Sequence, residues 1–229
     1  NPLGLNENIK SSMIKAVDKV IKYPDITYFN LKNSIGEFES ISSNNIILGN
    51  GAAEVIFNII RALNPKKALL PAPTFSEYEE AILSIGGDIE YFHLKEEESF
   101  ILNNKFIESI NENIDITFIC NPNNPTGAIM TREELEPLVA VLKDKDVIVI
   151  SDEIYAELSY DRRHVSIASF PEIKDKTLVI NGFSKAYAMT GWRLGYVCGN
   201  PVLIEAMKKI HQYAIMCSPT TAQYAAIEA

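Results

Sequence analysis

NGFSKAYAMTGWRLGY, residues 181–196, directly follows the apolar run Thr177–Ile180. The apolar run is typical of a buried strand. Small residues surround Lys185 just after it, and Arg193 follows eight positions later. A lysine in a partly desolvated pocket can form a Schiff base with a carbonyl, and the planar guanidinium of an arginine suits a phosphate. A phosphorylated aldehyde cofactor would use both side chains; the alternative is that Lys185 is an ordinary surface lysine.

The overall composition is that of an ordinary globular protein. The chain has 229 residues, 47% of them hydrophobic and 22% charged, which is long enough for one large α/β domain. Its net charge of −9 argues against a nucleic-acid partner. No apolar run approaches the roughly 20 residues that span a bilayer, and no signal-peptide pattern opens the sequence. We therefore expect a cytoplasmic protein without a membrane partner.

Cysteines and histidines give no sign of a metal site. The three cysteines are odd in number, lack metal-ligand spacing and lie in or beside apolar runs, which predicts buried free thiols and suits a reducing compartment. They are Cys120, Cys198 and Cys217. The three histidines are scattered along the chain, and none is assigned a catalytic role.

Strand and helix patterns alternate along the sequence. Short apolar runs predict strands at 45–48, 68–70, 89–93, 114–120, 147–150, 177–180 and 194–198. Helical patterns lie between them, and the first, through Met13 to Ile21, is stopped by Pro24. A charged piece at 95–99 predicts a solvated loop, and Thr131 with Glu134 forms a capping box that starts a helix. This alternation predicts an α/β fold with a mostly parallel sheet between layers of helices.

A glycine-rich turn follows the first predicted strand. Gly51, Ala52 and Ala53 lead directly from that strand into a helix. Backbone N–H groups at a helix N-terminus favour an anion, because the helix dipole adds to their own donor capacity. The turn is therefore a candidate phosphate cradle, although a plain tight turn would have the same sequence.

The stretch SKAYAMTGWRLGY resembles the lysine segment of the fold-type I, class I/II aminotransferases, which depend on pyridoxal 5'-phosphate. The resemblance implies that Lys185 binds the cofactor and Arg193 its phosphate. GNGAAE is similar to the family's phosphate turn, but Ala52 replaces the usual hydroxyl residue and leaves only backbone donors. Ser184 is expected to bond the phosphate, whereas Gly182 stands where relatives often have a hydroxyl.

Three further motifs resemble the same family. Phe75 in PAPTFSEY matches the aromatic residue that stacks on the pyridine ring; the alternative is a core phenylalanine. Asn124 in NPNNPTG, a turn whose amides we expect to point outward, matches the residue that bonds the ring oxygen. Asp152 and Tyr155 in DEIY match the partners of the pyridine nitrogen and of the ring oxygen. An ionised Asp152 at a strand end would keep that nitrogen protonated.

The beginning of the sequence suggests a second subunit. NPLG and the later Tyr23-Pro-Asp resemble the opening of histidinol-phosphate aminotransferases and threonine-phosphate decarboxylases. In those families the tyrosine reaches the cofactor phosphate of the neighbouring subunit. The resemblance therefore implies a homodimer in which Tyr23 contacts the partner's cofactor; the alternative is that Tyr23 packs at a helix end.

The resemblance also predicts the domain organisation. Residues 1–30 would form an N-terminal arm and helix, and residues 31–229 the cofactor-binding large domain. Relatives continue into a small C-terminal domain, which we do not find in this sequence. Of the 19 asparagines, 17 lie in residues 1–127, and four of the five arginines lie after them. We therefore consider a chimeric junction near residues 121–128, with divergence within one natural protein as the alternative.

The motifs together predict an aminotransferase that moves an amino group between an amino acid and a 2-oxo acid. Lys185, Asp152 and Tyr155 would be its catalytic residues. Two alternatives stay open. The first is a decarboxylase of a phosphorylated amino acid, because the same cofactor chemistry serves both reactions. The second is a truncated or chimeric fragment that binds the cofactor without turnover.

Overall fold

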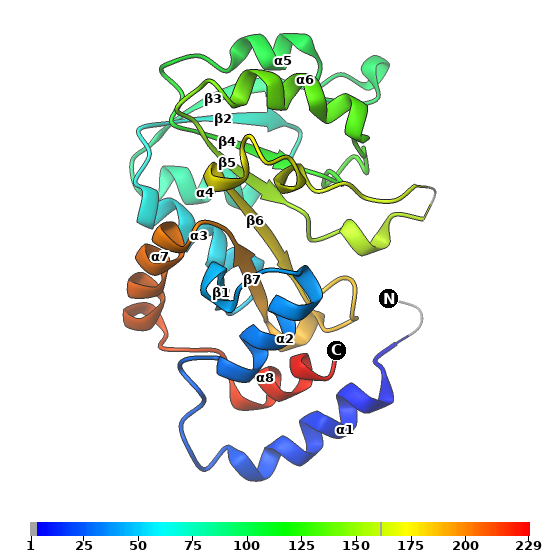
Figure 1. Cartoon of the computed structure of the whole chain (residues 1–229), viewed down its shortest axis with the longest axis vertical. Coiled ribbons are helices and arrows are strands. Elements are labelled where there is room, and N and C mark those ends of the chain that lie inside the picture. The colour runs from blue at the N-terminus through cyan, green and yellow to red at the C-terminus, as the bar shows by residue number, and fades with distance from the viewer. Residues whose placement is uncertain (1–3, 161) are drawn as a thin grey trace. The chain divides into compact units, whose positions relative to one another are not determined.

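A computed structural model describes residues 4–160 and 162–229 (Figure 1). Most of the NPLG motif, residues 1–3, lies outside the described part of the chain. The chain forms two compact units. Unit 1 consists of residues 1–62 and 181–229, and unit 2 of residues 63–180.

Unit 2 is built on a parallel sheet of five strands, ordered β6-β5-β4-β2-β3. The strands are β2 (Lys67–Ala72), β3 (Asp88–His93), β4 (Ile116–Cys120), β5 (Ile148–Asp152) and β6 (Thr177–Gly182), whose last two residues belong to unit 1. Every residue of β4 is buried. Continuous apolar strands form parallel sheets because helices cover both faces of such sheets.

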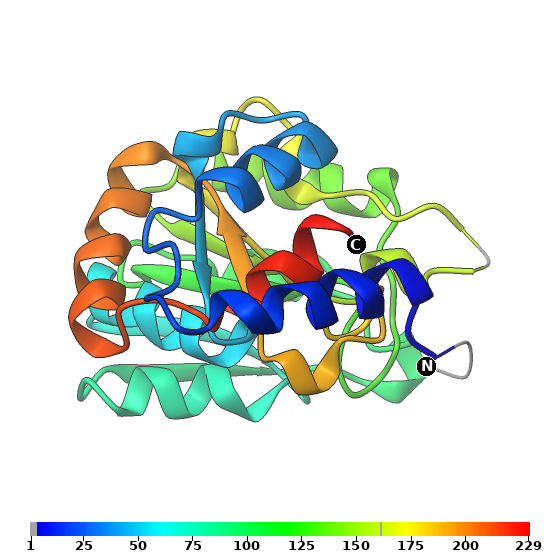
Figure 2. The ribbon, with the colours of Figure 1, turned by 90° about the horizontal axis from the view of Figure 1, so that it is seen from below.

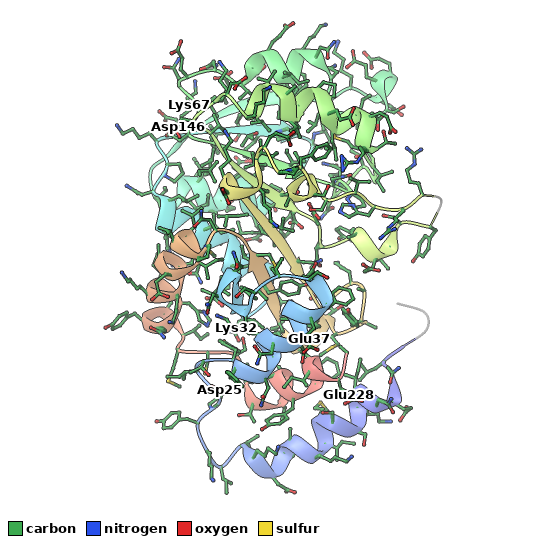
Figure 3. All side chains as sticks on the ribbon, in the orientation of Figure 1. Asp25, Lys32, Glu37, Lys67, Asp146 and Glu228 are labelled. Carbon is green, nitrogen blue, oxygen red and sulfur yellow. The ribbon has the colours of Figure 1, made fainter. Side chains whose placement is uncertain are left out.

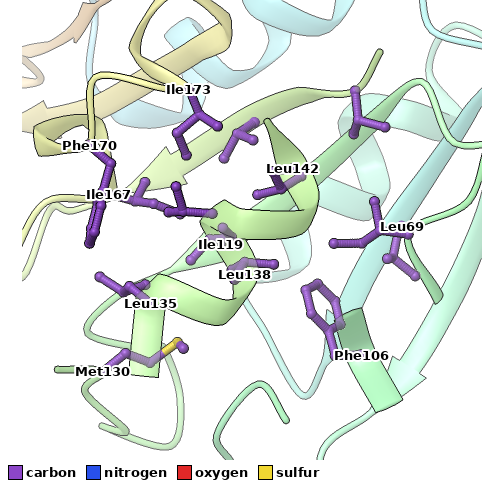
Figure 4. Close-up of a cluster of buried hydrophobic side chains, with 14 of the residues drawn as sticks. Leu69, Phe106, Ile119, Met130, Leu135, Leu138, Leu142, Ile167, Phe170 and Ile173 are labelled. Atoms are coloured by element: carbon purple, nitrogen blue, oxygen red, sulfur yellow. The ribbon is translucent and has the colours of Figure 1, made fainter. Parts of the chain in front are cut away.

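Helices cover both faces of this sheet. On one face, α5 (Asn104–Ser109) and α6 (Arg132–Leu142) bury a large apolar cluster that includes Phe106, Ile119 and Leu138 (Figure 4). On the other face, Tyr78 of α4 (Ser76–Leu83) stacks on Phe118 with ring centroids 4.5 Å apart. The predicted parallel sheet between helical layers is therefore confirmed.

Both ends of α6 are capped by side chains. At the start, Thr131 and Glu134 form the predicted capping box. At the end, Lys176 Nζ donates to the carbonyls of Leu142 and Lys145, at 2.5 Å each. Terminal carbonyls of a helix have no intrahelical partner, and a cation there also complements the helix dipole.

Replacing Lys176 by methionine is expected to lower the free energy of unfolding by about 1–2 kcal/mol, because the α6 carbonyls lose a charged donor. Denaturant unfolding would measure the change. The matched control is Lys174→Met, which removes an exposed lysine two positions away. Equal stability losses in the two variants would contradict the cap.

Unit 1 pairs β1 (Ile46–Gly49) antiparallel with β7 (Gly195–Cys198). Its helices are α1 (Glu7–Ala16), α2 (Phe29–Glu39), α3 (Ala52–Leu63, which ends at the first residue of unit 2), α7 (Pro201–Ala214) and α8 (Thr220–Ile227). Figures 1 and 2 show α8 lying beside α1. No helix in the described ranges is long and apolar enough to cross a membrane.

The N-terminal helix differs from its prediction. α1 ends at Ala16 and continues only as a single 3-10 turn, Val17–Lys19, while Ile21 is 86% exposed. The expected apolar helix as far as Pro24 is therefore wrong. Asp25 (Figure 3) lies ahead of the next helix, α2, and its carboxylate accepts the N–H groups of Thr27 and of Phe29, the first residue of α2.

Candidate functional site

The antiparallel register of β1 and β7 brings the Gly51 turn, residues 50–53, to Arg193. Gly49, the last residue of β1, pairs with Gly195, the first residue of β7. Two positions after Gly49 and two before Gly195 are therefore Gly51 and Arg193, which lie opposite each other. Gly51 has a φ of +92°, and a Cβ atom at that position would lie 2.6 Å from Arg193 Nη2. Only a glycine leaves room there for the guanidinium. Arg193 also has positive φ and donates from Nη1 to the carbonyl of Thr190 at 3.2 Å.

The Gly51 turn has the donors that an anion needs. Ala52 and Ala53 open α3, and the first N–H groups of a helix have no intrahelical partner. The side-chain nitrogen of Asn50 is buried without a hydrogen-bond partner among the described residues. With the nearby guanidinium of Arg193, these groups fit a phosphate.

Lys185 and Ser184 lie in the turn that follows β6, also in unit 1. Both residues are half-buried. The turn is tied by the Thr190 hydroxyl, which donates to the Ser184 carbonyl at 2.9 Å. Gly182, the last residue of β6, is buried. Lys185 thus lies at a strand end among small residues, as its motif predicts.

Tyr23 lines a different part of unit 1 from the Gly51 turn. Its side chain is 86% exposed, so it does not pack at the helix end. It lines a pocket of about 580 Å³ with residues of the N-terminal segment and of α8, among them Asp18, Asn30 and Tyr224. No residue of the Gly51 turn lines this pocket.

In unit 2, three predicted residues follow the carboxyl ends of neighbouring parallel strands. Phe75 follows β2, Asn124 follows β4, and Asp152 ends β5. Cys120 and Asp152 are register partners at this edge. Ligands of α/β proteins bind at this end of the strands.

Asp152 is held by two donors in a buried environment. The Tyr78 hydroxyl donates to its Oδ2 at 2.6 Å, and the Ile154 N–H donates to its Oδ1 at 3.1 Å. The carboxylate residue is only 3% exposed. Burial and the Asp152 charge raise the pKa of Tyr78, which keeps this hydroxyl a donor. The contact of Tyr78 with Asp152 was not predicted from the sequence. Tyr78 lies in the PAPTFSEY motif, three positions after Phe75, and this position was the one feature that could have indicated it.

Phe75 is half-buried and does not belong to the core. Its ring meets the edge of Tyr78 at a centroid distance of 5.7 Å and an interplanar angle of 85°. Tyr155 is also half-buried and begins the 3-10 turn Ala156–Leu158.

Two of the three asparagines in the NPNNPTG turn have buried, hydrogen-bonded side chains. Asn121 accepts the N–H of Met130, and Asn123 accepts both the N–H and the hydroxyl of Thr126. Both asparagines are buried. The expectation that the amides of this turn point out is thus wrong for two of the three. Asn124 is half-buried.

The thiol of Cys120 closes the same turn. It donates to the Pro122 carbonyl at 3.3 Å and accepts the Asn124 N–H at 3.4 Å. Cys120 and Cys217 are buried and free, as predicted, whereas Cys198 is only half-buried, so the prediction of burial is wrong for it. Residues 4–160 and 162–229 contain no cluster of histidine, cysteine or acidic side chains that could hold a metal.

Cys120 is expected to resist alkylation in the folded protein. Burial, with the negative charge of Asp152, raises its pKa to about 12, so very little thiolate exists near neutral pH. Iodoacetamide labelling followed by mass spectrometry would measure this, with the urea-unfolded chain as the control. Rapid labelling of Cys120 in the native protein would contradict the assigned burial.

The comparisons with known proteins agree on one family. The sequence model for "Aminotransferase class I and II" matches residues 4–229. YugH of Bacillus subtilis, provisionally named an aminotransferase, is 43% identical over 188 residues, which cover 81% of this chain and 49% of YugH. The threonine-phosphate decarboxylase of Salmonella typhimurium is 30% identical, over 86% of this chain and 54% of its own length.

A solved structure extends the likeness to three dimensions. The aspartate aminotransferase of Thermus thermophilus with maleate has a TM-score of 0.92 at 29% identity, and the match covers 99% of this chain and 62% of that structure. This chain therefore spans about half the length of the curated relatives named above.

Proposed function

We propose that this chain, which belongs to the class I and II aminotransferase family, binds pyridoxal 5'-phosphate and serves transfer of an amino group between an amino acid and a 2-oxo acid. Members of this family depend on pyridoxal phosphate. The observation that carries the proposal is the Gly51 turn, whose glycine lies against the guanidinium of Arg193.

The proposed binding residues come from both units. In unit 1, the backbone of Gly51, Ala52 and Ala53, with Arg193 and Ser184, would hold the phosphate. In unit 2, Phe75 would cover the ring, Asn124 and Tyr155 would bond its oxygen, and Asp152 would bond its nitrogen.

When bound, the cofactor supplies an electron sink for the substrate's α-carbon. The protein residues would supply the rest. Lys185 would hold the cofactor through Nζ and yield it to the substrate's amine. The freed Lys185 amine would then take the substrate's α-proton and return it as general base and acid. Asp152, whose Oδ2 accepts the Tyr78 hydroxyl, would keep a proton on the ring nitrogen as a carboxylate.

The first test is the visible absorption spectrum of the chain after addition of pyridoxal phosphate. The parent should show a band that Lys185→Ala lacks and that the control Lys174→Ala retains. Borohydride reduction and peptide mapping should then place the cofactor on Lys185. The absence of any band in the parent, or an unchanged band in Lys185→Ala, would sink the proposal.

Decarboxylation of a phosphorylated amino acid is the second candidate, favoured by the Salmonella decarboxylase match. Carboxyl-labelled amino acids separate the two reactions. Release of labelled carbon dioxide would identify a decarboxylase, whereas a labelled 2-oxo acid would identify an aminotransferase. If the cofactor binds and neither product forms with any donor, the 229 residues act as a binding fragment without turnover.

We further propose a cytoplasmic homodimer in which Tyr23 contacts the partner's cofactor. The exposed side chain of Tyr23 supports a contact outside its own chain, and free thiols suit a reducing compartment. Sedimentation would test the dimer. A monomer whose Tyr23→Phe variant binds pyridoxal phosphate as tightly as the parent would contradict it.

The arm of residues 1–30, the large domain of residues 31–229 and a junction near 121–128 stay proposals. The arm would be tested by removing residues 1–30 and measuring thermal unfolding of the rest. The junction rests on the uneven distribution of asparagine and arginine. One natural genome that encodes the whole chain without interruption would refute it.

A further inference from the structure

A chain of buried polar side chains in unit 1 lies outside the residues assigned above. His211 Nδ1 lies 2.8 Å from Glu54 Oε1, and His211 Nε2 lies 3.0 Å from the Tyr28 hydroxyl. The same hydroxyl accepts the Ser218 N–H at 2.5 Å. Tyr28, His211 and Ser218 are at most 3% exposed. We call these four residues the Glu54 network.

Glu54 connects this network directly to the Gly51 turn. Its Oε2 accepts the Asn50 N–H at 2.5 Å, and its Oε1 also accepts the Asn58 side chain at 2.7 Å. A Cβ atom on Gly49 would lie 2.6 Å from Oε2, so the carboxylate packs tightly against the turn's backbone. The position of Glu54 therefore fixes where the turn begins.

The charge of Glu54 bears on anion binding at the start of α3. Burial alone would raise its pKa, but hydrogen bonds from His211, Asn50 and Asn58, together with the charge of His211, lower it overall, which favours the carboxylate form. An ionised carboxylate in the first turn of α3 would repel a phosphate at the same helix end. The donors from Asn50, Asn58 and His211 hold the carboxylate and compensate its charge.

His211 is bonded at both ring nitrogens. Nδ1 bonds Glu54, and Nε2 bonds the Tyr28 hydroxyl. That hydroxyl also accepts the Ser218 N–H and lies 3.3 Å from the Ser218 hydroxyl. Burial raises the pKa of Tyr28, so its hydroxyl keeps its proton. Removing any member leaves a buried polar group unpaired.

We propose that His211 is a positioning residue for phosphate binding, because it holds Glu54 where Glu54 fixes the Gly51 turn and leaves the helix end open to an anion. The inference rests on the proposed function in one respect, the role of the Gly51 turn as the phosphate site. His211 itself does not touch the cofactor in this proposal; it acts through Glu54.

The test compares pyridoxal phosphate with pyridoxal, which lacks the phosphate. In the full 229-residue chain, His211→Leu should weaken binding of pyridoxal phosphate about tenfold and leave the affinity for pyridoxal unchanged. His211→Asn should restore most of the difference, because its amide nitrogen can replace the Nδ1 donor to Glu54. Parent-like preference for the phosphate in His211→Leu would overturn the inference.

A matched control separates positioning from general stability. Met207→Ala removes a buried apolar side chain from the same helix, α7, and should lower the melting temperature without changing the ratio of the two affinities. If Met207→Ala shifts that ratio as His211→Leu does, the effect is only structural and the inference is wrong. If His211→Leu does not fold, Tyr28→Phe, which removes one hydroxyl, should produce the same shift at a smaller size.

A measurement without ligand separates this inference from the proposed function. Hydrogen exchange of the Asn50 amide should accelerate in His211→Leu and return toward the parent rate in His211→Asn, because the amide donates to Glu54. If the exchange rate of the Asn50 amide in His211→Leu equals that of the parent, His211 does not position Glu54 and the inference is wrong. A parent chain that binds pyridoxal and pyridoxal phosphate equally would refute the phosphate site itself, and the role of His211 in binding with it.

Discussion

Asp152→Asn is expected to lower the rate of amino-group transfer at least about 100-fold, because the carboxylate that we propose as the partner of the ring nitrogen would be lost. An amide of nearly the same shape keeps the volume of the site. It cannot provide the negative charge that retains a proton on that nitrogen. The structure makes Asp152 well suited to this role, because Tyr78 and the Ile154 N–H fix both of its oxygens.

The control for this experiment is Asp146→Asn. Asp146 is exposed and lies just before β5, at the opposite end of the strand from Asp152. Single-turnover kinetics with pyridoxal phosphate and an amino donor would measure both variants. A rate within about twofold of the parent in Asp152→Asn would contradict the assigned role, since such a change is under about 0.5 kcal/mol.

Gly51→Ala is expected to weaken the binding of pyridoxal phosphate at least about tenfold. The new methyl group would lie 2.6 Å from Arg193 Nη2, so the guanidinium would have to leave its place beside the turn. The positive φ of residue 51 adds backbone strain of about 1 kcal/mol for any residue with a Cβ. Equilibrium titration followed by absorption would measure the affinity.

Gly86→Ala separates these two causes. Gly86 also has a positive φ, +76°, but a Cβ atom there would meet nothing within 4 Å. This variant should lose a similar amount of stability from backbone strain while its affinity for pyridoxal phosphate stays that of the parent. A tenfold loss in both variants would show that strain, and not the displaced guanidinium, weakens binding.

The sequence alone predicted the strands well, whereas the roles of the candidate site residues stay predictions. Apolar runs such as the one before Asp152 are distinctive, and the motifs around Lys185 and Asn124 leave little freedom of alignment. α2 was not predicted, because its sequence FNLKNSIGEFE contains asparagine, serine and glycine, which are weak helix formers. The hydrogen bond from its first residue, Phe29, to the Asp25 carboxylate becomes visible only with the fold.

Contacts between distant positions could not be predicted either. The NPNNPTG motif does not predict that the side chains of Asn121 and Asn123 are buried. Their hydrogen-bond partners, Met130 and Thr126, are set by the path of the loop. His211 and Glu54 are 157 positions apart. A lone histidine in an amphipathic helix gives no sign of such a partner.

The pairing of β1 with β7 has a consequence for how the protein is made. Gly49 and Gly195 are register partners across 146 residues of sequence, whereas unit 2 is one continuous segment, residues 63–180. During synthesis, unit 2 is complete before β7 has left the ribosome, so β1 waits without its partner strand. The Gly51 turn, which follows β1, is therefore among the last features to form in the nascent chain.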